Sequence, residues 1–169
     1  SYPEPEPVSV EKAIAEINGI SPEEVMVTNG ATESIYLIAR TGAKCHSAIV
    51  IPTFREYQDA CRMNGHRISF VTTLAEIPAD CQMVWLCNPN NPTGTVTDRL
   101  RLLRVAARNP DKIFVIDQAY SDYTPLQTLS ARDALNAGNI ILLGSLTKRF
   151  AVPGLRIGYS IACASLLSR

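Results

Sequence analysis

Lys148 stands in the segment SLTKRFAVPGLRIGY, residues 145–159, with small hydroxyl side chains beside it and Arg156 eight residues later. A single lysine is in most cases a solvated surface charge. Its amine can also form a Schiff base with a carbonyl group if the fold places it in a suitable site. What Lys148 does therefore depends on the residues that the fold brings near it.

Three other segments carry polar residues where an apolar run ends. Ala31 and Thr32 follow a glycine turn at an expected helix start, where free backbone N–H groups favour a phosphate, although many such turns have glycine for tight geometry alone. Asn91 stands beside two prolines that restrict the backbone, and an ordinary turn would also explain it. Asp117 and Tyr120 follow the run KIFVI, and Asp117 could pair with a cation or cap the next element.

Together these residues suit one cofactor, pyridoxal 5′-phosphate. This cofactor needs an amine for a Schiff base, an acid that keeps its ring nitrogen protonated, donors to its phenolic oxygen and a phosphate cradle. Lys148 is predicted to be the amine and Asp117 the acid, because a carboxylate preserves the positive charge with which the ring absorbs electrons. Asn91 and Tyr120 would serve the phenolic oxygen. The predicted phosphate cradle consists of Ala31, Thr32, Ser145, Thr147 and Arg156.

Helical and strand patterns alternate along the chain. Helical periodicity is expected over residues 8–18, 31–40, 54–66 and 97–110. Apolar runs predict strands over 25–27, 47–52, 66–71, 81–87, 112–117 and 139–145. These runs lack polar alternation, as expected of parallel strands covered on both faces. The predicted class is α/β: a three-layer fold with a mostly parallel central sheet between helices, and a site at the carboxyl ends of the strands.

Composition narrows the functions further. Sixteen Lys and Arg balance sixteen Asp and Glu, so we expect no nucleic acid and no membrane among the partners. The first residues lack the pattern of a secretory signal, and a cytoplasmic location is expected. Five cysteines without a CxxC pair are expected to be mostly buried and not a disulfide framework. His46 and His66 are expected at the surface or at strand edges, and no metal site is predicted.

The motifs TNGATES, PTFREY, NPNNPTG, IDQAY and SLTKRFAVPGLRIGY together resemble a known family across nearly the whole chain. They are similar to the large domain of fold-type I pyridoxal-phosphate enzymes, in the histidinol-phosphate aminotransferase and threonine-phosphate decarboxylase branch. The resemblance implies the same roles for the residues named above. It also places Phe54 on the pyridine face of the cofactor, while Tyr57 is expected to pack in the core. Gln118 is a departure, because many relatives carry an acid there.

The resemblance also implies a domain organisation and partners. Residues 1–9 would form an N-terminal arm and residues 10–169 the cofactor-binding large domain, without the smaller C-terminal domain that grips the substrate carboxylate. Tyr2 resembles a tyrosine that reaches the phosphate in the neighbouring subunit, which implies a homodimer. Such a fragment is expected to fold and hold the cofactor, but to be inactive alone.

The implied activity is an aminotransferase that acts on an amino acid or a phosphorylated amine such as histidinol phosphate. The first alternative is the threonine-phosphate decarboxylase of cobalamin biosynthesis, because the same residues around the cofactor serve either reaction. A non-catalytic cofactor-binding module shares every motif. A dinucleotide-binding domain is a weaker alternative, because no GxGxxG follows the first strand.

Overall fold

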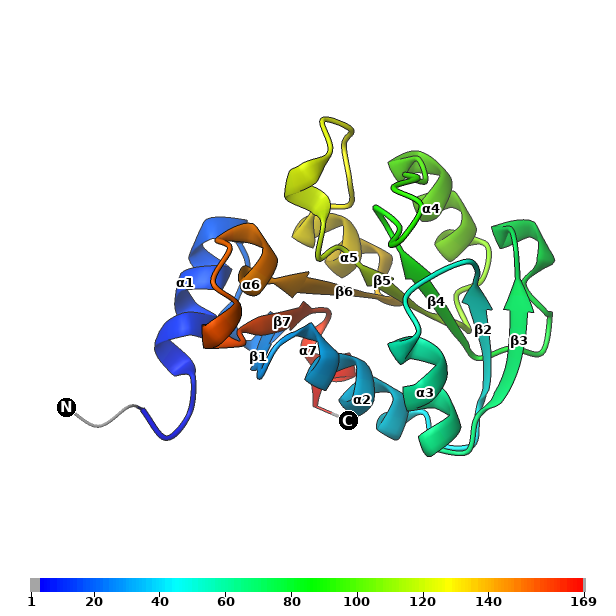
Figure 1. The fold of residues 1–169 in the computed structure, drawn as a ribbon, viewed down its shortest axis with the longest axis horizontal. Helices are drawn as coiled ribbons and strands as arrows, with labels where there is room; N and C mark the ends of the chain where they lie inside the picture. The colour runs from blue at the N-terminus through cyan, green and yellow to red at the C-terminus, as the bar shows by residue number, and fades with distance from the viewer. Residues whose placement is uncertain (1–3, 169) are drawn as a thin grey trace.

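One seven-stranded sheet forms the centre of the computed structural model, which describes residues 4–168 (Figure 1). Its strand order is β1-β7-β6-β5-β4-β2-β3. The strands from β3 to β6 pair in parallel, whereas β7 is antiparallel to both β6 and β1. The predicted mostly parallel sheet is therefore confirmed. The strands are β1 Val25–Thr28, β2 His46–Val50, β3 Arg67–Val71, β4 Met83–Cys87, β5 Ile113–Asp117, β6 Ile140–Ser145 and β7 Gly158–Ile161.

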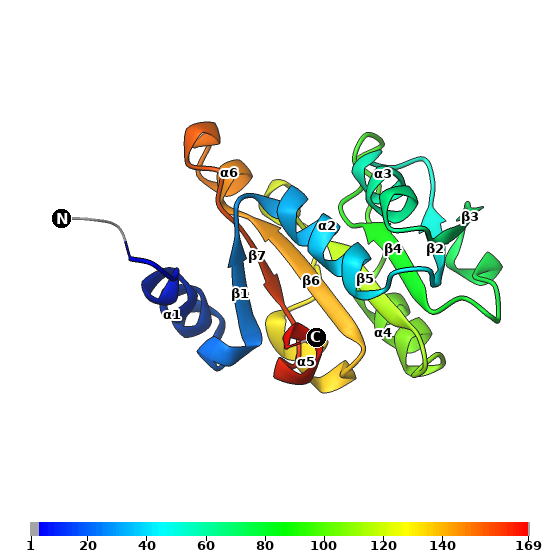
Figure 2. The ribbon, with the colours of Figure 1, turned by 90° about the horizontal axis from the view of Figure 1, so that it is seen from below.

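Helices cover both faces of this sheet, which confirms the three layers (Figure 2). One face packs against α1, α4 and α5, and the other packs against α2 and α3. The α-helices are α1 Val8–Asn18, α2 Ala31–Thr41, α3 Glu56–Met63, α4 Arg99–Ala107, α5 Ala131–Ala137, α6 Leu146–Arg149 and α7 Ala164–Leu167. Short 3₁₀ turns are η1 Pro22–Glu24, η2 Leu74–Glu76, η3 Ser121–Tyr123 and η4 Pro153–Leu155.

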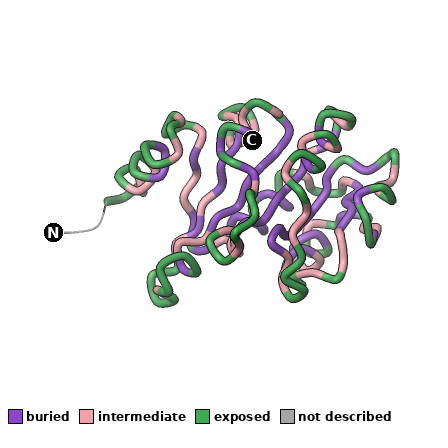
Figure 3. The backbone as a smooth tube through the Cα atoms, turned by 90° about the horizontal axis from the view of Figure 1, so that it is seen from above, coloured by how far each residue is buried: buried purple, intermediate pink, exposed green. Residues whose placement is uncertain are grey.

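The strand β4 shows why the apolar runs have no polar alternation. All five of its residues are buried, and they alternate between the two cores. Val84 and Leu86 face α4 and α5, whereas Met83, Trp85 and Cys87 face α2 and α3. Figure 3 shows the same arrangement for the sheet as a whole, with buried strands inside and exposed helix surfaces outside. A sheet covered on both faces needs apolar residues at every position.

One strand and three short helices were missing from the sequence-based prediction: β7, α5, α6 and α7. The antiparallel strand β7 begins at the end of the lysine segment and is defined by its pairing with β1 and β6. The seven-residue helix α5 is too short for a clear period, but its start carries a capping box in which Ser130 and Asp133 bond each other's backbone N–H. The predicted helix over 54–66 is shorter at both ends, and the last two residues of the predicted N-terminal arm, Val8 and Ser9, already belong to α1.

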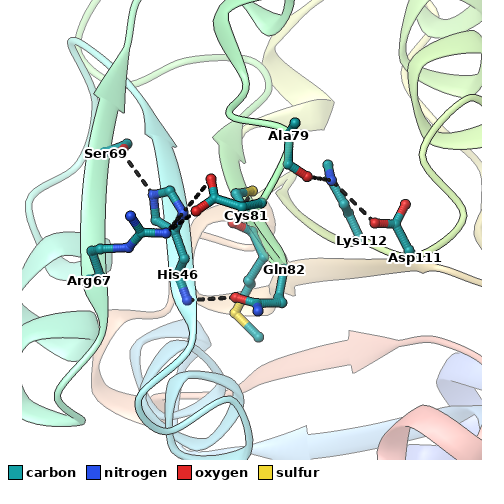
Figure 4. A network of polar contacts seen from close by, with 10 residues as sticks. His46, Arg67, Ser69, Ala79, Cys81, Gln82, Asp111 and Lys112 are labelled. Atoms are coloured by element: carbon teal, nitrogen blue, oxygen red, sulfur yellow. Dashed lines mark hydrogen bonds and ion pairs between the residues drawn. The ribbon is translucent and has the colours of Figure 1, made fainter.

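Both histidines are buried, so a surface position for them is wrong. His46, at the start of β2, contacts Ser69 through Nε2 at 2.8 Å and receives a hydrogen bond from Arg67 at Nδ1 at 2.7 Å (Figure 4). His66 donates from Nε2 to the Ala39 carbonyl at 2.8 Å, and its Nδ1 meets the Ser47 hydroxyl at 2.9 Å. Polar partners at both ring nitrogens offset the free-energy cost of this burial.

The other expectations from composition concern cysteines and membranes. The five cysteines are free thiols, and Cys61, Cys81 and Cys87 are buried, as predicted for most of them. Residues 4–168 contain no group of three or more metal-ligating side chains that could hold an ion. Within the same range, no helix has the length and apolar character that crossing a membrane requires.

Candidate active site

A cavity of about 220 Å³ opens where the carboxyl ends of β4, β5 and β6 approach the start of α2. Every predicted site residue in the described part of the chain lines it. These are Ala31, Thr32, Phe54, Asn91, Asp117, Tyr120, Ser145, Thr147, Lys148 and Arg156. Tyr2 lies outside the described residues. The fold thus brings the five motifs together, while the role of each residue stays a prediction.

Asp117 supplies a buried negative group to this cavity. It is the last residue of β5 and only 5% exposed. Its two oxygens accept hydrogen bonds from the Tyr57 hydroxyl at 2.7 Å and from the Ala119 backbone N–H at 2.9 Å. Burial raises the pKa of this carboxyl, and the two hydrogen bonds act in the opposite direction. Two neutral donors do not replace the countercharge that a buried carboxylate needs.

The neighbours of Asp117 in the sheet and on α3 are neutral. Cys87 lies opposite Asp117 in the β4–β5 pairing, and burial raises the pKa of its thiol to about 11. Burial and the nearby Asp117 carboxyl raise the pKa of Tyr57 well above its ordinary value. Among the described residues, no ion pair reaches Asp117. The cavity therefore offers a negative site that a cationic group of a ligand can complete.

Tyr57 was expected to pack in the core, and it does so, but its hydroxyl also belongs to the site. The residue is 1% exposed, and its ring stacks on Trp85 with a centroid distance of 5.8 Å. Phe54 meets the same ring edge to face at 5.9 Å and is itself 36% exposed at the cavity. A buried tyrosine hydroxyl usually needs a hydrogen-bond partner. The position of Tyr57 on the apolar face of its helix could therefore have predicted a polar contact for its hydroxyl.

Lys148 presents a free amine to the cavity from the short helix α6, which follows β6 directly. Its Nζ lies 5.7 Å from the centroid of the Tyr120 ring. In residues 4–168 the amine makes no hydrogen bond or ion pair. The start of α6 is held by the Ile157 carbonyl, which accepts from the N–H groups of Leu146 at 3.1 Å and Thr147 at 3.4 Å. Backbone hydrogen bonds thus hold the start of the helix that carries the lysine, whereas its Nζ has no hydrogen-bond or ion-pair partner in the described residues.

The start of α2 forms a compact cradle with Arg156. Gly30 precedes the helix with φ +79°, and a Cβ there would lie 2.8 Å from Nη2 of Arg156, so the guanidinium lies directly over it. Gly158 of β7 passes so close to α2 that a Cβ would overlap the backbone of Gly30 and Ala31. Free N–H groups at a helix start and an arginine fork both favour a phosphate.

Comparison of the sequence with known proteins identifies the family of this chain. The family model "Aminotransferase class I and II" matches residues 1–169. The chain belongs to this aminotransferase family. A curated relative is histidinol-phosphate aminotransferase 1 of Pasteurella multocida, which is 32% identical over 179 residues that cover 98% of this chain and 51% of the relative. The chain spans about half the length of the curated relatives it matches.

Solved structures give the same fold. L-threonine-O-3-phosphate decarboxylase from Porphyromonas gingivalis superposes with a TM-score of 0.95 at 35% identity, over 99% of this chain and 56% of that chain. Histidinol-phosphate aminotransferase from Sinorhizobium meliloti, solved in complex with pyridoxal-5′-phosphate, has a TM-score of 0.89 at 22% identity. It covers 98% of this chain and 49% of the other, and at that identity it supports the fold only.

The loop after β4 fixes Asn91 in this aminotransferase domain through its neighbours. The Asn88 side chain donates to the Thr97 carbonyl at 3.0 Å and accepts from the Thr97 N–H at 2.7 Å. Asn90 donates to the Pro52 carbonyl at 2.8 Å. The Asn91 side chain has no such partner in the described residues, so its amide is available at the cavity.

Gln118, the departure from the family pattern, points to a structural contact and not to the cavity lining. It is 8% exposed, and its side-chain amide donates to the Leu129 carbonyl at 3.2 Å. This bond ties the end of β5 to the loop before α5. A neutral amide can make it without the cost of burying a charge.

Asp117→Asn in the cofactor-free aminotransferase chain is expected to change the pH dependence of folding. Because the folded pKa is raised, the wild-type carboxyl opposes folding as pH rises above its ordinary unfolded value of about 4, until the folded pKa is passed. The asparagine variant lacks this loss. Urea unfolding at several pH values should show the free energy of unfolding of the variant rising relative to wild type between acid and neutral pH. A constant difference between the two proteins would contradict the expectation.

Proposed function

We propose that this chain is the cofactor-binding part of a pyridoxal-phosphate-dependent aminotransferase, with Lys148 as the covalent anchor. The observation that carries the proposal is that one cavity is lined by both the buried Asp117 carboxylate and the free Lys148 amine. Asp117 needs a cation, and a protonated pyridine nitrogen is one. The Gly30–Arg156 cradle needs an anion, and a phosphate is one. The residues present therefore fit the cofactor.

The positions of the side chains support the following proposed roles. Asp117 holds the ring nitrogen in its protonated form, with Tyr57 orienting the carboxylate. Asn91 and Tyr120 donate to the phenolic oxygen, and Phe54 stacks on the ring. The cradle of Ala31, Thr32, Ser145, Thr147 and Arg156 holds the phosphate. Bound pyridoxal phosphate supplies an electron-withdrawing ring that stabilises negative charge on a substrate carbon.

Lys148 has two successive tasks in this proposal. Its Nζ first holds the cofactor through a covalent bond to the aldehyde carbon. Once released from the bound cofactor by the amino group of a substrate, the Lys148 amine would act as the base that takes the proton from the substrate Cα. The substrate class is an amino acid or a phosphorylated amine such as histidinol phosphate, as the names of the curated relatives suggest.

A second candidate function is decarboxylation of threonine phosphate. The similarity to the Porphyromonas gingivalis decarboxylase favours it, at 35% identity and a TM-score of 0.95. The same residues serve either reaction, because Lys148 can move a proton at Cα whether a proton or carbon dioxide leaves Cα first.

A homodimer in which Tyr2 reaches the partner's phosphate belongs to the proposal, and so does the expected cytoplasmic location.

The test begins with cofactor binding. The chain is incubated with pyridoxal phosphate, its visible spectrum is recorded, and borohydride reduction is followed by peptide mass mapping. A visible band and a reduced cofactor mass on Lys148 are expected. Tight NADH binding without a band would favour the dinucleotide alternative and overturn the proposal.

Substrates separate the two reactions. The protein at the full length of its relatives, loaded with pyridoxal phosphate, is supplied with histidinol phosphate and a 2-oxo acid, or with phosphothreonine. Amino transfer in the first assay supports the aminotransferase, and carbon dioxide release in the second supports the decarboxylase. If this full-length protein traps the cofactor on Lys148 but leaves both compounds unchanged, it is a non-catalytic module.

A further inference from the structure

The segment Tyr120–Tyr123, which includes η3, contacts the helix α6 that carries Lys148. The Tyr123 hydroxyl donates to the backbone carbonyl of Lys148 at 2.8 Å. Asp122 pairs with the Arg149 guanidinium at 3.6 Å, and the Lys148 amine lies 5.7 Å from the Tyr120 ring centroid. Three of the four residues in this segment therefore contact two successive residues of α6, about 25 positions later in the chain.

The helix α6 has little support of its own at this point. It comprises four residues and cannot continue beyond Phe150, since Ala151 has a φ of +52°. The other donors to the Lys148 carbonyl are backbone N–H groups of the same irregular turn, those of Phe150 and of Ala151, the latter at 3.3 Å. The bond from Tyr123 ties this carbonyl to η3, which follows the buried strand β5 in the chain. A one-turn helix is marginal unless tertiary contacts hold it.

We infer that Tyr123 is a positioning residue for Lys148, an inference that rests on the proposed function. The phenolic oxygen and the aldehyde carbon are attached to neighbouring ring atoms of pyridoxal phosphate. Tyr120 and Lys148, the residues proposed for these two groups, must therefore keep a fixed separation. Tyr123 secures it, because its hydroxyl holds the Lys148 backbone while its ring lies against Tyr120 with a centroid distance of 6.0 Å.

The hydroxyl of Tyr123, and not the burial of its ring, carries this role. The side chain is 67% exposed, so its ring contributes little to the core. Phenylalanine at this position keeps the ring contact with Tyr120 and removes only the bond to the Lys148 carbonyl. Tyr123→Phe is therefore a narrow test of the positioning role. A matched control is Tyr36→Phe, which removes a hydroxyl that donates to Glu56 at 2.9 Å away from the cavity lining.

The first measurement needs no cofactor. Backbone hydrogen exchange is followed by mass spectrometry in the peptide that covers α6 and Ala151, at a pH where exchange reports local opening. Loss of one neutral hydrogen bond is expected to speed this exchange about fivefold in Tyr123→Phe. Tyr36→Phe is expected to exchange at the wild-type rate in the same peptide.

The second measurement follows the covalent attachment itself. Pyridoxal phosphate is added to each protein, samples are quenched with borohydride over time, and the reduced cofactor on Lys148 is quantified by mass. Tyr123→Phe is expected to attach cofactor about fivefold more slowly than wild type and the Tyr36→Phe control, because its amine visits the productive position less often.

The two measurements separate the possible failures. Wild-type exchange in Tyr123→Phe would overturn the inference, since the bond would then hold nothing in place. Faster exchange with an unchanged rate of attachment would also overturn it, because Tyr123 would then support the backbone without positioning the amine. Absence of any trapped cofactor in wild type would contradict the proposed function, while the exchange result would still decide whether Tyr123 holds α6.

Discussion

Lys148→Ala is expected to abolish the visible absorption band of the protein with pyridoxal phosphate and the borohydride-trapped cofactor. The lysine is exposed and its amine has no hydrogen-bond or ion-pair partner in the described residues, so the fold should survive the change. The Gly30–Arg156 cradle and Asp117 remain, and they should still bind the cofactor non-covalently. Turnover by the complete enzyme should fall by about 10²–10⁴-fold from loss of the base alone, and further from loss of the covalent anchor.

The control for this experiment is Lys12→Ala. Lys12 lies exposed on α1 and does not line the cavity, so its removal should leave the band and the trapped mass unchanged. The chain contains two further lysines, Lys44 and Lys112. Lys112 is buried with its amine bonded to the Ala79 carbonyl at 2.7 Å. Trapped cofactor on any of these three lysines, with none on Lys148, would reject the assignment.

Gly158→Ala is expected to damage the fold and the phosphate cradle together. A Cβ at this position overlaps the backbone at the Gly30–Ala31 junction, so either β7 or the start of α2 must move. Overpacking of this kind costs about 1–3 kcal/mol, and in a domain of this size each kcal/mol lowers Tm by about 2–4 °C. Displacement of the α2 N–H groups should weaken cofactor binding by about tenfold or more. Thermal unfolding and a cofactor titration measure the two effects.

Gly154→Ala provides the comparison for Gly158→Ala. Gly154 lies in η4 of the same segment, where an added Cβ would meet no described atom within 4 Å and the backbone is not left-handed. Its substitution should leave Tm and cofactor affinity within error of wild type. Equal effects of the two substitutions would show that the segment is sensitive to any change, and would contradict the role given to the close approach of β7 and α2.

The sheet and most helices could be predicted because their signals are local. Apolar runs of five or six residues, such as those that became β4 and β6, need no information about their neighbours to be recognised as buried strands. The strand β7 is different, because the four residues from Gly158 to Ile161 become a strand through pairing with β1 and β6. Its antiparallel direction depends on the tertiary structure and not on its own pattern.

The cavity residues could be predicted for a related reason. Polar groups that follow parallel strands meet at one edge of the sheet, so the positions of Asp117 and Asn91 follow from the order of the elements. The partners of those groups do not. The contact between Tyr57 and Asp117 joins residues 60 positions apart, and the burial of His46 depends on Arg67 and Ser69 from the next strand. Such pairings arise from packing that a single sequence does not display.

The position of β7 also sets an order for the assembly of this protein. The strand β1 lies at one end of the sheet and, within residues 4–168, pairs with β7 alone, which is synthesised more than a hundred residues later. Until β7 leaves the ribosome, β1 has no strand beside it, and the start of α2 has no Gly158 or Arg156 against it. The parallel strands β2 to β6 can pair earlier. We therefore expect the Gly30–Arg156 cradle to form after the parallel part of the sheet, and the nascent chain to lack this part of the proposed cofactor site until β7 has been made.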